Sequence, residues 1–131
     1  MAATTTWMRW RRGSTQARSR NRQLESLAEI FRENPHGEGI LLGDLNITPW
    51  SPYFATLETE TELLNAARGE GYRGTWPVQP FIFRIPIDHC LLSAGFQVRR
   101  IRTGPDIGSD HLPLVVDVVA VDDAHRVNSA E

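Results

Sequence analysis

Apolar residues recur at spacings of three and four between positions 21 and 33, which is typical of a helix that buries one face. The apolar positions are Leu24, Leu27, Ala28, Ile30 and Phe31. We predict that this helix ends at residues 34–37, because Pro35 disfavours helix at the residue before it and Gly37 permits a turn. Residues 1–19 show no convincing period, and we expect them to be irregular.

Short apolar runs bounded by glycine or proline predict the strands. Ile40–Leu42 lies between two glycines, as a buried strand does. Segments 85–92 and 96–101 are predicted to be neighbouring strands joined across residues 93–95, and valine-rich 112–121 is predicted to be the last strand. The pattern therefore predicts a mixed α/β domain.

A second, shorter helix is predicted after residue 51, with Ser51 as its N-cap and Pro52 at its first position. The pattern at residues 63–66 predicts either a short strand or the end of a helix. Three glycines and two prolines predict a loop over residues 69–80, and we expect the polar tail 122–131 to be frayed.

The chain has 131 residues, which corresponds to one domain. Its longest apolar run, Val118–Val121, is far too short to cross a membrane. Cys90 has no second cysteine to pair with, which excludes an internal disulfide or a cysteine-rich zinc site and fits a reducing compartment. The sequence has no secretory signal pattern, so we expect a cytoplasmic location.

The net charge of −2 hides a division along the chain. Every basic residue is arginine, and residues 1–22 hold six arginines and no acid, whereas the remainder carries a net charge of −8. This arginine arm could contact phosphate backbones or anionic lipid. The alternative is a loosely ordered leader without a partner, which the acidic remainder favours.

Three short strings place acid, amide or imidazole groups at the ends of apolar strands. They are GDLN at 43–46, IDH at 87–89 and GSDH at 108–111. In an extended segment Asp44 and Asn46 point the same way. Carboxylate and amide oxygens are hard ligands suited to Mg²⁺ or Mn²⁺, and a histidine beside them could transfer protons or stabilise a phosphate.

Each string alone has a simpler explanation. Asp44 and Asn46 could form a turn through their own backbone, and His111 could be structural. Asp88, inside an apolar strand, is harder to dismiss, because a buried carboxylate needs a partner. The occurrence of all three strings in one short chain favours a functional site.

The order of GDLN, IDH and GSDH resembles the endonuclease/exonuclease/phosphatase superfamily, the metal-dependent phosphoesterases that include DNase I and the abasic-site endonucleases. Longer strings are similar to a YafD-like bacterial branch: RNRQL, GDLNITPWSP, GTWP, RIPIDH and GPDIGSDHLPLVVD. The resemblance covers residues 20–121. It implies the C-terminal half of a DNase I-like four-layer αββα sandwich, mostly antiparallel sheet with flanking helices, between the leader 1–19 and the tail.

The resemblance also implies roles for matching residues. Asp44 would hold the attacking water or a metal, and Asn46 would contact the phosphate or the metal. Asp110 would be a metal ligand. His111 would bind or protonate the scissile phosphate region, while Asp88 would hydrogen-bond to His111 and fix its tautomer, which also favours the charged imidazole.

Other residues carry weaker implications. Trp76 lies where the family has an aromatic residue near the substrate, although core packing would account for it equally well. Arg84 could contact a phosphate, or it could be a solvated charge at a strand end. His36, His89 and His125 match no catalytic position of the family.

The sequence departs from the family by lacking the N-terminal half, which supplies an asparagine, a glutamate metal ligand and a histidine or tyrosine. Residues 1–19 contain no acid and no histidine that could replace them. We therefore expect half a site, with weak binding of Mg²⁺ or Mn²⁺. We also expect an apolar sheet face without its covering sheet. The chain would then either form a homodimer through that face or be only marginally folded alone.

These implications predict a metal-dependent phosphoester hydrolase whose activity is impaired because half of the site is missing. One alternative is a non-catalytic half-domain or partner-binding module. Another is a nucleic-acid-binding protein that uses the arginine arm. The motifs leave the phosphoester substrate open among nucleic acid, lipid phosphate and small phosphodiesters, and longer relatives of this branch can carry membrane segments upstream.

Overall fold

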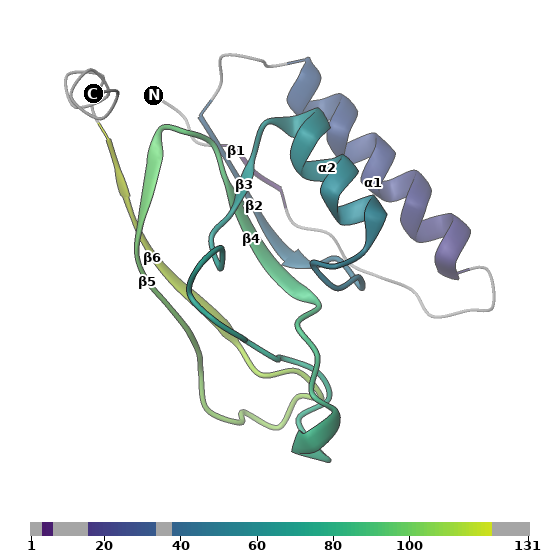
Figure 1. The fold of residues 1–131 in the computed structure, drawn as a ribbon, viewed down its shortest axis with the longest axis vertical. Helices are drawn as coiled ribbons and strands as arrows, with labels where there is room; N and C mark the ends of the chain where they lie inside the picture. The colour runs from purple at the N-terminus through teal and green to yellow at the C-terminus, as the bar shows by residue number, and fades with distance from the viewer. Residues whose placement is uncertain (1–3, 7–15, 34–37, 122–131) are drawn as a thin grey trace.

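The structure is a computed structural model that describes residues 4–6, 16–33 and 38–121. The strands are β1 (Thr4–Thr6), β2 (Gly39–Asp44), β3 (Leu64–Asn65), β4 (Asp88–Leu92), β5 (Phe96–Thr103) and β6 (Leu114–Ala120). The helices are α1 (Gln16–Arg32), α2 (Pro52–Thr61) and a short 3₁₀ turn, η1 (Phe81–Phe83). Helices and strands alternate up to β4, and β5 and β6 then follow without a helix between them (Figure 1).

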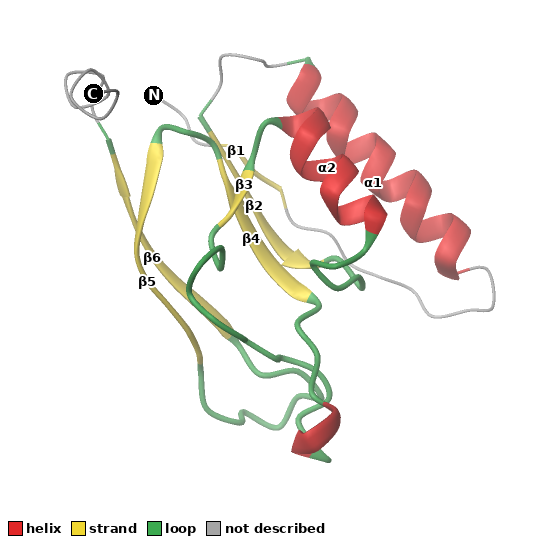
Figure 2. Cartoon of the chain, viewed as in Figure 1, coloured by secondary structure: helices red, strands yellow, loops and turns green. Residues whose placement is uncertain are grey.

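The strands form two sheets. The larger has the order β1-β2-β4-β3, in which β1 is parallel to β2 and the other pairs are antiparallel. The smaller is the antiparallel pair β5–β6. Helices α1 and α2 lie side by side on one face of the larger sheet and β5–β6 lies on the other (Figure 2). This arrangement confirms the expected α/β class with mostly antiparallel sheet and flanking helices.

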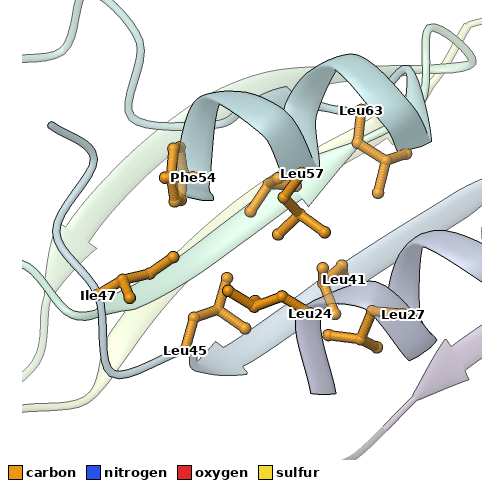
Figure 3. Close-up of a cluster of buried hydrophobic side chains, with 9 residues drawn as sticks. Leu24, Leu27, Leu41, Leu45, Ile47, Phe54, Leu57 and Leu63 are labelled. Atoms are coloured by element: carbon orange, nitrogen blue, oxygen red, sulfur yellow. The ribbon is translucent and has the colours of Figure 1, made fainter. Parts of the chain in front are cut away.

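Between the helices and the larger sheet lies a closed apolar core, the helix-side cluster (Figure 3). Its members are at most 4% exposed: Leu24, Leu27, Leu41, Leu45, Ile47, Phe54, Leu57, Leu63 and Leu91. Leu24 and Leu27 are three residues apart on one face of α1. Leu41 of β2 and Leu91 of β4 are paired residues of the sheet that face the helices. Burying each one contributes roughly 1.5–3 kcal/mol relative to exposure, which makes this cluster the main source of stability.

A second cluster, the hairpin-side cluster, lies between the larger sheet and β5–β6. Ala66, Cys90, Leu92 and Ile101 are buried in it, while its other members are only partly buried. The expectation of an uncovered apolar sheet face is therefore wrong, because the two-stranded sheet β5–β6 covers this face. The physical reason is that β5 and β6 are apolar on one face and bury that face on the larger sheet.

The predicted pairing of segment 96–101 with segment 85–92 is also wrong. β4 already has β2 on one edge and β3 on the other, so β5 has no free edge of β4 to join. At the turn that follows β4, Ser93 N donates to Gly39 O and Phe96 N to Ser93 O, and the chain then enters the second sheet. A three-residue connection can join two paired strands or lead the chain into another sheet, and the tertiary arrangement decides between these two outcomes.

The N-terminal expectation needs two corrections. Residues 4–6 are not irregular, because they pair with β2 in the register Thr4↔Gly39. The first helix begins at Gln16, before the predicted start at residue 21. Strand β1 forms by pairing with a distant segment, and the first turn of α1 is polar. Neither gives a local apolar period, so the hydrophobic pattern could not reveal β1 or the true start of α1. The predicted breaker at 34–37 and the frayed tail 122–131 lie outside the described residues.

Three further segments match the prediction, whereas η1 was not predicted and the strand expected from residue 85 begins at Asp88. Ser51 is the N-cap of α2 and Pro52 follows it, and β3 lies within residues 63–66. Segment 69–80 is a loop apart from one bridge between Trp76 and Ile85. Within the described ranges, no helix is long and apolar enough to cross a bilayer.

Candidate active site

Strand pairing places two of the predicted site residues opposite each other. In the β2–β4 ladder, Asp44 lies across from Asp88, and beyond this pair Leu45 N donates to Ile87 O at 3.0 Å. Side chains alternate along β4, so Asp88 lies on the same face as Cys90 and Leu92 in the hairpin-side cluster. The two carboxylates therefore lie together at the end of the larger sheet, on the side that β5–β6 covers.

The loop between β5 and β6 delivers the third motif to the same place. Val78 N donates to Asp110 O at 3.0 Å, and Leu112 N donates to Thr75 O at 2.9 Å. These two bonds hold the backbone on both sides of His111. Earlier in the loop Gly108 adopts a φ of 84°, a conformation that favours glycine.

The His111 imidazole lies between the two carboxylates. Its Nδ1 is 2.8 Å from Asp88 Oδ2, and its Nε2 is 3.9 Å from Asp44 Oδ2. The first distance is that of a strong charge-assisted hydrogen bond, whereas the second is too long for one. Asp88 thus holds one ring nitrogen and leaves the other facing Asp44. The side chains are 17–26% exposed, so solvent reaches the site.

Asp44 lies in an electrostatically unfavourable position. Burial is the main cause that raises the pKa of its carboxyl above the ordinary value. The Asn46 N–H and His111 lower that pKa, but the neighbouring carboxylates Asp88 and Asp110 raise it further. Three acidic groups that disfavour one another's charge would gain from a cation placed among them.

The predicted geometry of Asp44 and Asn46 is wrong in one respect. The segment is not extended, because Asn46 adopts a left-handed conformation with a φ of 55°. Asp44 Oδ1 accepts a hydrogen bond from Asn46 N at 2.8 Å, so the turn-forming alternative also holds. Asn46 itself is exposed at the rim of the site.

Trp76 lies next to His111, with their ring centroids 6.4 Å apart and their planes tilted by 44°. Trp76 is 37% exposed, so its ring is not sequestered in a core. Arg84 is part-buried and donates from Nε to Pro77 O at 3.2 Å and from Nη2 to Val78 O. The interpretation of Arg84 as a solvated charge is therefore wrong, since its guanidinium donates hydrogen bonds that hold the loop carrying Trp76.

The candidate metal donors fit Mg²⁺ or Mn²⁺ in type but not in number. Asp44, Asp110 and Asn46 offer carboxylate and amide oxygens, which hard divalent cations prefer. Yet within residues 4–6, 16–33 and 38–121, no group of three or more histidine, cysteine or acidic side chains could hold a metal. A cation there would need further ligands, and the expectation of weak binding stays a prediction.

His89, next to Asp88, has a structural position. It is 3% exposed, its ring packs on Phe54 with centroids 4.5 Å apart, and its Nε2 donates to Ile47 O at 2.7 Å. Burial lowers the pKa of His89. His36 and His125 lie outside the described residues.

Thr75, which the motifs did not single out, connects the segment that leads to Asp88 with the loop that carries His111. It is fully buried, its backbone N donates to Ile85 O, and its carbonyl accepts from Leu112 N. Its Oγ1 also accepts from Asp88 N at 3.4 Å. The available signal was the string GTWP, whose threonine is the one hydroxyl residue between Gly74 and Pro77.

Comparison with protein families gives one match, to the Endonuclease/Exonuclease/phosphatase family over residues 4–111. The chain belongs to this family. The match spans all three motifs of the site and confirms the resemblance at the level of the superfamily. The YafD-like branch stays a prediction. A comparison with curated protein sequences finds no match.

Solved structures share the fold. A functionally unknown conserved protein from Enterococcus faecalis V583 is 20% identical with a TM-score of 0.67, covering 80% of this chain and 46% of its own length. An endonuclease/exonuclease/phosphatase family protein from Bacteroides thetaiotaomicron is 22% identical with a TM-score of 0.63, covering 79% and 45%. The mannosyl-6-phosphatase of B. thetaiotaomicron VPI-5482 is 20% identical with a TM-score of 0.61, covering 78% and 46%. The chain thus spans less than half the length of each relative.

Proposed function

We propose that this chain carries the C-terminal half of a metal-assisted phosphoester hydrolase site, with phosphodiesters as its substrates. The single observation that supports this most is the position of His111 between Asp88, 2.8 Å from Nδ1, and Asp44, 3.9 Å from Nε2. A histidine held on one side by a carboxylate and open on the other is suited to act on a substrate phosphate.

In the proposed reaction each side chain has a separate task. Asp88 accepts a hydrogen bond from the Nδ1–H of His111, which keeps Nε2 directed at the site. Nε2 in its protonated form donates a hydrogen bond to a phosphate oxygen and stabilises the charge that develops there. Asp44 orients the water that attacks phosphorus, the ester P–O bond on the opposite side breaks, and the proton that the water loses passes through solvent to the departing ester oxygen. Asn46 contacts the phosphate from the rim, and Trp76 borders the substrate.

Asp44, Asp110 and Asn46 would hold Mg²⁺ or Mn²⁺, which would supply charge neutralisation at the phosphate oxygens. The raised pKa of Asp44 is consistent with this assignment, because a cation would offset its repulsion from Asp88 and Asp110. The incomplete donor set implies weak affinity.

A second candidate function is a non-catalytic half-domain that binds a partner. It is favoured by the incomplete metal donor set in the described residues. A cytoplasmic location and membership of the YafD-like branch stay predictions. The homodimer also stays a prediction, although β5–β6 covers the sheet face through which it was expected. Nucleic-acid binding by the arginine arm is a third, weaker candidate.

The test is hydrolysis of bis-p-nitrophenyl phosphate with excess Mg²⁺ or Mn²⁺. We expect metal-dependent turnover that falls about a hundredfold or more in His111→Ala. His125→Ala is the matched control, since it removes a histidine that matches no catalytic position, and it should retain full activity. Absence of turnover in a folded sample, or equal turnover in both variants, would reject the enzyme and favour the half-domain.

A further inference from the structure

A protruding apolar turn lies beside the site. Residues 76–85 form a loop that is closed at its base by the Trp76–Ile85 bridge and braced by Arg84. Its tip is η1, which lies at one end of the molecule, far from helices α1 and α2 (Figure 2). Phe81, Ile82 and Phe83 are 67%, 70% and 66% exposed. Three consecutive large apolar side chains with this exposure carry a hydration cost that contact with an apolar phase would remove.

An arginine-lined cavity of about 860 Å³ adjoins this tip, and Phe81 and Ile82 form part of its wall. Its basic residues come from the loop 70–84 and from β5. They are Arg73, Arg84, Arg99, Arg100 and Arg102. One acidic residue, Glu70, is also part of the lining, so the surface is strongly cationic although the whole chain is acidic.

The cationic character follows from the local geometry of β5. Arg100 and Arg102 are two residues apart and therefore share a face of the strand. A register shift between Val98 and Arg100 adds Arg99 at an irregular position. Within the part of the chain that the structure describes, none of these three side chains forms an ion pair. Their charge is therefore available to an anionic partner.

We propose that the η1 tip and the arginine-lined cavity together dock this protein on an anionic phospholipid membrane. Phe81, Ile82 and Phe83 would enter the boundary between headgroups and acyl chains, and the arginines would contact lipid phosphates. A nucleic acid would account for the cavity, but it would leave the tip unexplained. Phe83 is not part of the cavity lining, and a polyanion in the groove would not desolvate it.

Docking in this orientation would also position the candidate active site. The base of the loop carries Trp76, whose ring lies 6.4 Å from that of His111. Insertion of the tip would therefore bring the site toward the headgroup layer, where phosphodiesters are concentrated. Docking itself does not depend on the proposed hydrolysis, and it can be measured on protein that is inactive.

The test is co-sedimentation of the full chain with vesicles of phosphatidylcholine containing about a third phosphatidylglycerol. We expect the chain to bind these vesicles and to bind pure phosphatidylcholine much less. Replacing the tip by Phe81→Ser, Ile82→Ser and Phe83→Ser together should weaken binding about a hundredfold. Arg99→Gln, Arg100→Gln and Arg102→Gln together should weaken it about tenfold or more and reduce its dependence on salt.

Two controls keep this interpretation distinct from others. Arg18→Gln, Arg22→Gln and Arg32→Gln remove the same charge from α1 and should leave vesicle binding unchanged. His111→Ala should also leave binding unchanged, so that failure of the hydrolase proposal and failure of docking are separable. Binding lost in the α1 variant and kept in the β5 variant would overturn the proposal. So would absence of vesicle binding together with arginine-dependent binding of a single-stranded oligonucleotide.

Discussion

The two faces of the larger sheet differ in how completely they are covered. On the helix side nine side chains are at most 4% exposed and one partly buried side chain, Phe31, packs against them. The hairpin-side cluster has four buried side chains and eight that are only partly buried. Two helices seal the first face, and a two-stranded sheet covers the second. The candidate site lies at the end of the second face. The main apolar core and the candidate chemistry of this half-fold therefore lie on opposite sides of one sheet.

The neighbours Asp88 and His89 illustrate the division within a single strand. Alternation along β4 directs His89 into the helix side against Phe54, and directs Asp88 to the hairpin side, where it meets His111. Two adjacent titratable residues therefore differ in role: His89 is part of the packing on the helix side, and Asp88 contacts the candidate site on the other side.

A matched pair of truncations should give the largest contrast between the faces. Leu27→Ala removes a 1% exposed side chain from the helix-side cluster and should lower the free energy of unfolding by about 2–5 kcal/mol. Leu114→Ala removes the same atoms from the partly buried hairpin side and should cost less than about half as much. Urea unfolding of both variants measures the difference. Equal losses would mean that the two faces are equally closed.

The second contrast is in activity. Asp88→Asn keeps the size of the side chain but removes the charge that holds His111 Nδ1, and it should lower kcat/KM for bis-p-nitrophenyl phosphate about a hundredfold. His89→Gln is the control on the opposite face, and it should change kcat/KM much less than it changes stability. A larger loss of activity in His89→Gln than in Asp88→Asn would reverse the assignment of the two faces.

The third and smallest effect is a pH dependence of stability. Burial holds the pKa of His89 below its ordinary value of 6.5, so the unfolded chain takes up a proton at a higher pH than the folded protein. The free energy of unfolding should therefore fall as the pH decreases below 6.5 toward the folded pKa, by at most about 1.4 kcal/mol per pH unit. Asp88 and Glu58, the acidic groups that interact with His89, oppose the lowering only in part.

His89→Gln isolates this contribution. The raised pKa of Asp44 has the opposite sign, because the folded protein then takes up that proton first and is stabilised as the pH falls, but it acts equally in both proteins. Urea unfolding between about pH 7 and pH 5 should give a smaller loss of stability in His89→Gln than in the original chain. Equal slopes would show that His89 does not titrate on unfolding.

Much of the fold was predictable because local patterns carry it. Three signals depend only on residues that are close in sequence. They are the spacing of three and four in the first helix, the glycines on both sides of Ile40–Leu42, and Ser51–Pro52 at the start of α2. The pairing of β1 with β2 and the transfer of β5 to a second sheet could not be predicted, since both depend on which strand edges are already occupied.

The candidate site was likewise predictable only where short local motifs define it. The motifs identified Asp44, Asp88 and His111, and the ladder and the loop bring these three together. The left-handed Asn46, the brace formed by Arg84 and the linking role of Thr75 arise from backbone contacts across the fold, which no spacing in the sequence encodes.

The tautomer of His111 shows whether Asp88 orients this imidazole, and it can be measured by long-range ¹H–¹⁵N NMR at about pH 9, where a free imidazole is neutral. We expect a proton on Nδ1, held by Asp88, and an unprotonated Nε2 facing Asp44. Asp88→Asn should abolish this preference. A proton on Nε2, or a His111 signal that is unchanged in Asp88→Asn, would contradict the claim that Asp88 orients His111 for phosphate chemistry.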